Sequence, residues 1–258
     1  MEKHKESFGR LLEIMDELRA KCPWDKKQTL ESLRTLTIEE TFELADAIVD
    51  DDLEEIKKEL GDLLLHIVFY AKIGSEKNAF DISDVIESIN KKLIYRHPHI
   101  FSDTKVQDAK EVEENWEKLK LTEKGGNKSV LEGVPRSLPA LIKAYRIQDK
   151  VRGVGFDWDE KEQVWDKVAE EFNELQVELK ENPESVEAEQ EFGDLFFSLI
   201  NAARLYGINP ENALEKTNLK FIKRFAYLED KTLKQGIDLK EMPLVEMEKI
   251  WQEAKKND

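Results

Sequence analysis

Two acidic stretches, Glu39-Glu40-Thr41-Phe42-Glu43 and Glu59-Leu60-Gly61-Asp62-Leu63, carry the pattern that decides the fold. Residues three and four positions apart share one face of an α-helix, so each stretch gathers its carboxylates on a helical face. The same stretches return in the same order as Glu170-Glu171-Phe172-Asn173-Glu174 and Glu191-Phe192-Gly193-Asp194-Leu195. The carboxylate pattern is therefore duplicated within the chain.

Flanking elements repeat together with the acidic stretches. Trp24-Asp25 returns as Trp158-Asp159, and a later element with Asn90, Lys92 and Arg96 returns with Asn218, Lys220 and Arg224. Four elements in one order, at an offset of about 130 residues, indicate an internal repeat of one structural unit. A stretch with several Gly and Pro residues, 125–139, lies between the copies. We therefore predict domains at 1–124 and 140–258, joined by a linker at 125–139.

The spacing of apolar residues predicts an all-α fold. Apolar residues recur every three or four positions almost throughout, and Pro or Gly falls between the resulting segments. The predicted helices cover 3–20, 30–50, 53–73, 82–95, 108–121, 137–150, 160–181, 184–206, 210–230 and 240–256.

Composition excludes several classes of protein. With 40% hydrophobic residues in 258, the chain can build a core, whereas a net charge of −16 argues against a nucleic-acid polymer as partner. A single cysteine, Cys22, rules out an intrachain disulfide framework. The N-terminus is charged where a signal peptide is apolar, and no apolar run is long enough to cross a membrane. We expect a cytoplasmic protein without membrane partners.

The acidic pairs lie in apolar surroundings. Asp62 is followed by three leucines, and Asp194 lies between Phe192 and Phe196. Carboxylates that face a helical bundle are costly unless they are paired or bound to metal, and four together repel one another. Oxygen ligands suit Mg²⁺, or Mn²⁺, and a Mg²⁺ ion keeps coordination positions for water and phosphate oxygens. The pattern predicts Mg²⁺-dependent chemistry on a phosphate ester or anhydride.

Basic residues supply the opposite charge. Lys220 and Arg224 lie four positions apart on one predicted helix, and Lys92 and Arg96 repeat this spacing in the first half. Such cations can bind phosphate oxygens and neutralise a leaving group. Lys167, one turn before Glu171, is a further candidate.

With these motifs the chain resembles the MazG family of nucleoside triphosphate pyrophosphohydrolases. The resemblance runs over nearly the whole length and also includes Cys22-Pro23-Trp24-Asp25, Arg96-His97-Pro98-His99 and Gly155-Phe156-Asp157-Trp158-Asp159. It implies hydrolysis of (deoxy)nucleoside triphosphates to monophosphate and pyrophosphate. It also implies homodimers, in which helices from two subunits complete each four-helix core.

The resemblance assigns roles to individual residues. One glutamate of each set is expected to orient or deprotonate the attacking water, with Glu40, Glu43, Glu171 and Glu174 as the candidates. The expected metal ligands are Glu40, Glu43, Glu59, Asp62, Glu171, Glu174, Glu191 and Asp194. The expected substrate-binding residues are Lys92, Arg96, Lys120, Lys167, Asn201, Lys220, Arg224 and Trp251.

The two halves are not equivalent, and other classes of protein remain open. Asn201 lies where the first half has Phe69, and Lys167 where it has Leu36, so the second half looks more complete. The main alternative is a non-catalytic helical module that binds a partner through its acidic faces. A ferritin-like di-metal bundle would need Glu-x-x-His in place of Glu-x-x-Asp. Another phosphate-releasing hydrolase on the same scaffold would form different products.

Overall fold

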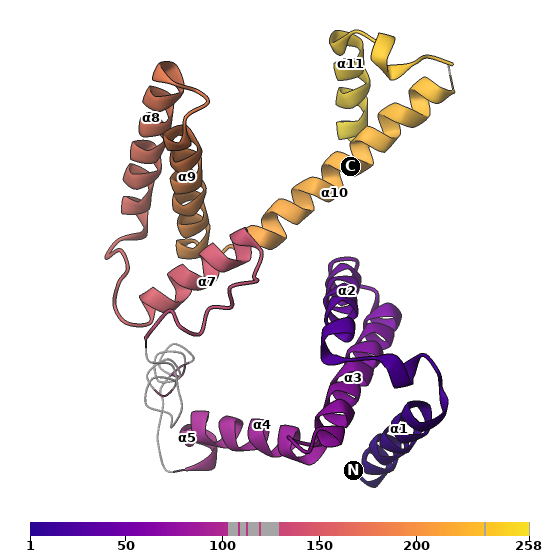
Figure 1. Ribbon diagram of the computed structural model, residues 1–258. Helices are drawn as coiled ribbons and strands as arrows, with labels where there is room; N and C mark the ends of the chain where they lie inside the picture. The colour runs from indigo at the N-terminus through magenta and orange to yellow at the C-terminus, as the bar shows by residue number, and fades with distance from the viewer. Residues whose placement is uncertain (103–107, 109–111, 113–118, 120–128, 235, 258) are drawn as a thin grey trace. The chain divides into compact units, whose positions relative to one another are not determined.

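The chain is helical in both halves. The computed structural model describes residues 1–102, 108, 112, 119, 129–234 and 236–257, and all regular secondary structure in those residues is helix. The prediction of an all-α fold is confirmed. The chain separates into two units, Met1–Lys105 and Val106–Asp258, and each is described by itself (Figure 1).

Unit 1 is built on a pair of helices that pack against each other. Its helices are α1 (Glu2–Lys21), η1 (Asp25–Lys27), α2 (Leu30–Val49), α3 (Leu53–Glu76), α4 (Ile82–Arg96) and α5 (Pro98–Phe101). Thr29 caps α2 in a capping box with Ser32, and the Asp52 carboxylate accepts hydrogen bonds from the first turn of α3. Only residues 50–52 separate α2 from α3, and the two helices pack against each other as a helical hairpin.

The core of unit 1 joins this hairpin to α1. Met15 of α1 and Leu33 of α2 are buried together with Val68, Phe69 and Ile73 of α3. Burying side chains of this size contributes about 1.5–3 kcal/mol each to folding. Arg19 of α1 adds an ion pair to this contact, because its guanidinium binds the carboxylate of Glu76, the last residue of α3, at 2.8 Å.

Unit 2 repeats this plan and extends it. Its helices are α7 (Ala140–Arg152), η2 (Lys161–Gln163), α8 (Val164–Glu181), α9 (Val186–Leu205), α10 (Pro210–Leu233), η3 (Leu239–Glu241), α11 (Leu244–Ala254) and η4 (Lys255–Asn257). Helices α8 and α9 form the second hairpin, and α7 packs on α9 as α1 packs on α3. Ser185 caps α9 and Asn209 caps α10, whose first residue is Pro210.

Some helix boundaries differ from the sequence-based expectation. The segments predicted at 137–150 and 240–256 begin at Ala140 and Leu244, because Pro139 and Pro243 take the N-cap positions. The one-turn helix α5 was not predicted. The helix predicted at 108–121 falls almost entirely outside the described residues, as does the start of the predicted linker at 125–139, so the domain boundaries stay a prediction. None of the described helices is both long and apolar enough to cross a bilayer.

Gly74 marks a close approach in unit 1. A Cβ atom at this position would lie 2.7 Å from the Phe80 ring and 2.9 Å from the Phe80 carbonyl oxygen. We expect Gly74→Ala to lower the melting temperature, because a backbone oxygen cannot move as a side chain does, at a cost on the order of 1–3 kcal/mol. Gly9→Ala in α1 is the matched control, because nothing lies within 4 Å of its added Cβ. An unchanged melting temperature for Gly74→Ala would contradict this packing.

Candidate metal centre and nucleotide site

Three glutamates meet across the hairpin of unit 1. Glu40 and Glu43 come from α2 and Glu59 from α3, and one carboxylate oxygen of each lies within 4.8 Å of the others. Glu59 is 1% exposed, and its Oε2 has no hydrogen-bond partner. The two halves of the motif, separate in the sequence, therefore form one cluster.

Unit 2 forms the same cluster at the corresponding positions. Glu171 and Glu174 of α8 and Glu191 of α9 bring their carboxylate oxygens within 4.8 Å of one another. Glu171 is 7% exposed, and Oε2 of Glu191 is buried without a partner. Among the described residues, these two clusters are the groups of three or more acidic, His or Cys side chains that could hold a metal ion.

The fourth predicted carboxylate lies near each cluster but is not part of the trio. The charge of Asp62 acts on Glu40, and that of Asp194 on Glu191. Burial, and next the charges of neighbouring carboxylates, raise the pKa of Glu40 and of Glu191. Both clusters are therefore short of positive charge, and a cation that binds several oxygens at once would relieve the repulsion.

Lysines partly neutralise the carboxylates. Lys167 binds Glu171 at 2.7 Å and Glu170 at 2.9 Å, while Lys58 binds Glu55 at 2.6 Å and Glu59 at 3.1 Å. These contacts raise the pKa of both lysines above its usual value. Lys167, expected to bind substrate, is thus placed directly at the cluster of unit 2.

The clusters fit a hard divalent cation. All the convergent ligands are carboxylate oxygens, and each cluster holds a buried oxygen without a partner, at Glu59 or at Glu191. Buried polar atoms without a partner are rare, and oxygen-only sites suit Mg²⁺ or Mn²⁺. The role of the eight acids as metal ligands stays a prediction.

Most of the other predicted substrate-binding residues that the structure describes lie on helices outside the two hairpins. Lys220 and Arg224 are on α10, which packs against α7, α9 and α11. At about 1.5 Å per residue, Arg224 lies roughly 20 Å along α10 from Pro210. Trp251 of α11 packs on Phe221 with ring centroids 4.9 Å apart, and the Arg224 guanidinium lies 5.9 Å from the Trp251 ring. Lys92 and Arg96 are on α4, and Lys120 is outside the described residues.

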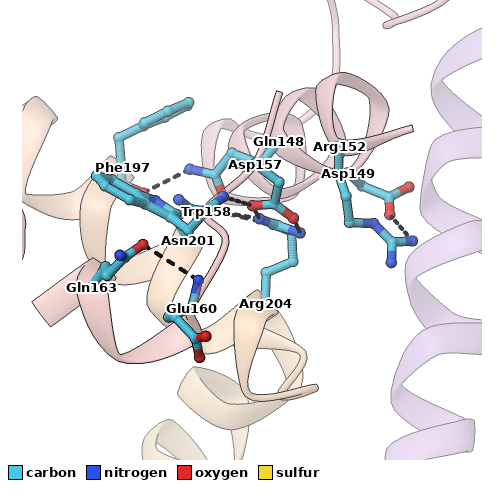
Figure 2. Close-up of polar contacts among 10 residues, drawn as sticks. All are labelled: Gln148, Asp149, Arg152, Asp157, Trp158, Glu160, Gln163, Phe197, Asn201 and Arg204. Carbon is cyan, nitrogen blue, oxygen red and sulfur yellow. Dashed lines mark hydrogen bonds and ion pairs between the residues drawn. The ribbon is translucent and has the colours of Figure 1, made fainter. Parts of the chain in front are cut away.

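Asn201 belongs to a network that the sequence did not reveal. Its Oδ1 accepts hydrogen bonds from Nε and Nη2 of Arg204 at 3.0 and 2.9 Å, and Arg204 forms a two-pronged ion pair with Asp157 (Figure 2). Arg204 and Asp157 were not among the predicted site residues. The spacing of three between Asn201 and Arg204 is the one signal that could have found the contact, because it puts both on one helical face.

The fold and the two clusters define a class of protein, namely a tandem all-α protein with a cluster of carboxylates in each helical hairpin. Residues 28–101 match the model of the MazG nucleotide pyrophosphohydrolase domain. The chain is 44% identical over 254 residues to the nucleoside triphosphate pyrophosphohydrolase/pyrophosphatase MazG of Thermotoga maritima, covering 97% of this chain and 96% of that protein.

Two further relatives match nearly the whole length of this chain. A nucleoside triphosphate pyrophosphohydrolase of Escherichia coli K12 is 41% identical over 257 residues, covering 97% of this chain and 98% of that protein. The uncharacterized protein YabN of Bacillus subtilis is 45% identical over 254 residues, covering 97% of this chain and 52% of that protein. The chain belongs to the MazG family.

The raised pKa of Glu191, caused by burial and next by the charges of neighbouring carboxylates, predicts a pH-dependent effect on stability. Because its pKa is raised in the folded chain, the fold binds this proton more tightly than the unfolded chain does, and the ionised form weakens the fold above that pKa. In EDTA at pH 8 we expect Glu191→Gln to melt at a higher temperature than the parent. The difference should vanish near pH 4, where the parent carboxyl is protonated.

The control for this comparison is Glu248→Gln, which removes an exposed carboxylate from α11 of the same unit. It should leave the melting temperature unchanged at both pH values. A lower melting temperature for Glu191→Gln in EDTA at pH 8 would show that the Glu191 charge stabilises the fold.

Proposed function

We propose that this protein hydrolyses (deoxy)nucleoside triphosphates to monophosphates and pyrophosphate, with Mg²⁺ as cofactor and a broad range of bases. The observation that carries the proposal is the pair of carboxylate clusters, one in each hairpin, in a chain of the MazG family. The relatives from Thermotoga maritima and Escherichia coli bear the name of this activity. Excess or non-standard nucleotides are the substrates that such an enzyme could remove.

The glutamate trio of each unit, with Asp62 or Asp194 beside it, would hold the cation. A bound Mg²⁺ supplies positive charge to the triphosphate oxygens and acidifies a coordinated water. In unit 2 the ligands would be Glu171, Glu174, Glu191 and Asp194. The buried Oε2 of Glu191 fits this role, because metal binding would satisfy an oxygen that has no partner in the chain.

The side chains of the cluster can also move the proton. Water attacks at the α/β linkage, one phosphorus–oxygen bond forms, and the bond to the bridging oxygen breaks. One glutamate of the set, Glu171 or Glu174, accepts the proton of the attacking water. Lys167 lies at the same cluster and can shift from Glu171 to a phosphate oxygen, since its ammonium already lies 2.7 Å from that carboxylate.

We assign Lys220 and Arg224 to binding the departing pyrophosphate, and Asn201 and Trp251 to binding the nucleotide. In unit 1 we assign the binding of pyrophosphate and nucleotide to Lys92, Arg96 and Lys120. Helix α10 leads from the end of α9 to α11, outside the α8–α9 hairpin that holds the carboxylates. We therefore propose that a second copy of the chain brings Lys220, Arg224 and Trp251 to the carboxylates. We place the enzyme in the cytoplasm, with no nucleic-acid polymer as partner, in line with its net charge of −16.

Exposed apolar stripes support the homodimer. Leu60, Leu64 and Ile67 line one face of α3, and Phe192, Phe196 and Leu199 occupy the corresponding positions of α9, each 39–61% exposed. Spacings of four and three residues put each stripe on one side of its helix. A two-helix hairpin with an uncovered apolar stripe is half of a four-helix bundle. Nothing in the described chain lies within 4 Å of a Cβ added at Gly61 or Gly193, which leaves room there for another helix.

The activity is tested with the full-length protein, each standard (d)NTP and Mg²⁺, with products separated by ion-exchange chromatography. We expect monophosphate and pyrophosphate, and no products in EDTA. Glu171→Gln/Glu174→Gln should reduce the turnover of unit 2 at least about 100-fold, because two ligands are lost at once. Comparing the turnover of this double variant with that of Glu40→Gln/Glu43→Gln shows how much of the activity each unit contributes.

The products distinguish the alternatives. Diphosphate with orthophosphate would overturn the cleavage position, and turnover in EDTA would overturn the role of the metal. Absence of turnover with every standard and modified nucleotide would favour a non-catalytic module. Glu248→Gln should match the parent, because its carboxylate is exposed on α11.

The second copy is tested by sedimentation velocity. The chain has a mass of 30.1 kDa, and we expect the parent to sediment at twice this mass. Phe196→Asp should sediment as a monomer and lose activity, because a charge would be buried in the bundle. The control Leu244→Asp changes an equally apolar, 76% exposed residue of α11 and should stay dimeric. A monomeric parent with full activity would contradict the dimer.

A further inference from the structure

The contact between the first helix and the hairpin is apolar in unit 1 and polar in unit 2. Ile14-Met15-Asp16 of α1 corresponds to Ile147-Gln148-Asp149 of α7, so Gln148 takes the position of Met15. Asn201 of α9 takes the position of Phe69. Met15 and Phe69 are both members of the buried core of unit 1. Polar side chains thus replace a core pair in unit 2.

Arg204 binds both Asn201 and Asp157. Its side chain is 6% exposed, and its Nη1 binds Oδ2 of Asp157 at 3.0 Å while its Nη2 binds the other oxygen. The same guanidinium donates two hydrogen bonds to Oδ1 of Asn201. One buried cation therefore joins α9 to the segment before η2, 47 residues away in the sequence (Figure 2).

The Arg204 contacts decide which way the Asn201 amide faces. A guanidinium carries only donors, so the amide must turn its oxygen toward Arg204 and its NH₂ group away. Within the described chain no hydrogen bond uses the Asn201 Nδ2, so this group presents two N–H donors. Donors suit the oxygens of a nucleotide, on the phosphate, the ribose or the base.

Gln148 of α7, which packs on α9, has a second polar atom without a partner. Its Nε2 donates to the Phe197 carbonyl at 2.7 Å, one helical turn before Asn201. Its Oε1 is buried without a partner, and the residue is 4% exposed. A buried acceptor without a partner lowers stability, so this contact is not arranged for stability alone.

We propose that Arg204, held by Asp157, is a positioning residue. It fixes the Asn201 amide so that the NH₂ group faces an oxygen acceptor of the nucleotide, an inference that rests on the proposed function. Asp157 orients the Arg204 guanidinium. Arg204 in turn disfavours the flipped Asn201 amide, in which the amide oxygen would face the ligand oxygen and repel it. The same ion pair anchors the segment that carries Trp158, because the Trp158 backbone N–H donates to Asp157 at 3.0 Å.

Unit 1 lacks this arrangement. Lys72 stands where unit 2 has Arg204, and it binds Asp16 at 2.6 Å. Phe69 lies under the guanidinium of Arg19, 5.5 Å from its ring centroid, and offers no hydrogen bond. The positioning of an amide donor is therefore a property of unit 2, and Lys72 provides a matched control.

A double-mutant cycle tests the proposal in the full-length chain with Glu40→Gln/Glu43→Gln, so that only unit 2 can turn over. Arg204→Lys keeps the charge but cannot donate twice to Asn201 while holding both oxygens of Asp157. We expect its KM to rise about 10-fold with kcat changed less than about 2-fold, as loss of one oriented hydrogen bond predicts. With Asn201→Ala already present, Arg204→Lys should change KM by less than about 2-fold.

Asp157→Asn provides a second route to the same result and should also raise KM only when Asn201 is present. Lys72→Met should leave KM unchanged. Equal losses with and without Asn201, accompanied by a lower melting temperature, would make Arg204 a structural residue only and overturn the inference. If the parent turns over and the background enzyme does not, the activity belongs to unit 1 and this inference is overturned. If the parent does not turn over either, the proposed function is overturned with it.

Discussion

Repulsion among carboxylates across a helical hairpin is the constraint on which the rest of each unit depends. Glu171, Glu174 and Glu191 lie within 4.8 Å of one another, and burial with neighbouring charge raises the pKa of Glu191. Packing of α8 on α9 holds these groups together against that repulsion, and Lys167 neutralises part of it. The apolar contacts of the hairpin, and not the acids themselves, therefore keep this cluster of carboxylates in place.

Duplication preserved this constraint and allowed the rest to diverge. Both hairpins keep three glutamates in contact and an apolar stripe on the outer face of the second helix. In unit 1 the preceding helix packs in an apolar core around Met15 and Phe69. In unit 2 it offers Gln148, which binds the Phe197 carbonyl, and Arg204 of α9 pairs with Asp157. The acids are thus shared by the two units, whereas the surroundings that would select a ligand belong to unit 2.

The sequence predicted the features that depend on local periodicity. Spacings of three and four placed the helices and put Glu40 with Glu43, and the repeat linked them to Glu59. Contacts between distant segments could not be predicted, because they depend on how helices pack: the Arg204–Asp157 pair spans 47 residues, and its partners carry no periodic signal. The position of Arg224 on α10, packed with Trp251, likewise follows from tertiary structure.

Binding of Mn²⁺ to the metal-free full-length chain, followed by electron paramagnetic resonance, tests most directly whether the carboxylate clusters are cation sites. We predict that added Mn²⁺ loses its free-ion signal as it binds, and that replacing Glu40, Glu43, Glu171 and Glu174 together by Gln abolishes this loss while leaving the helical content unchanged. Binding that survives in the quadruple variant, or no binding by the parent, would contradict the assignment.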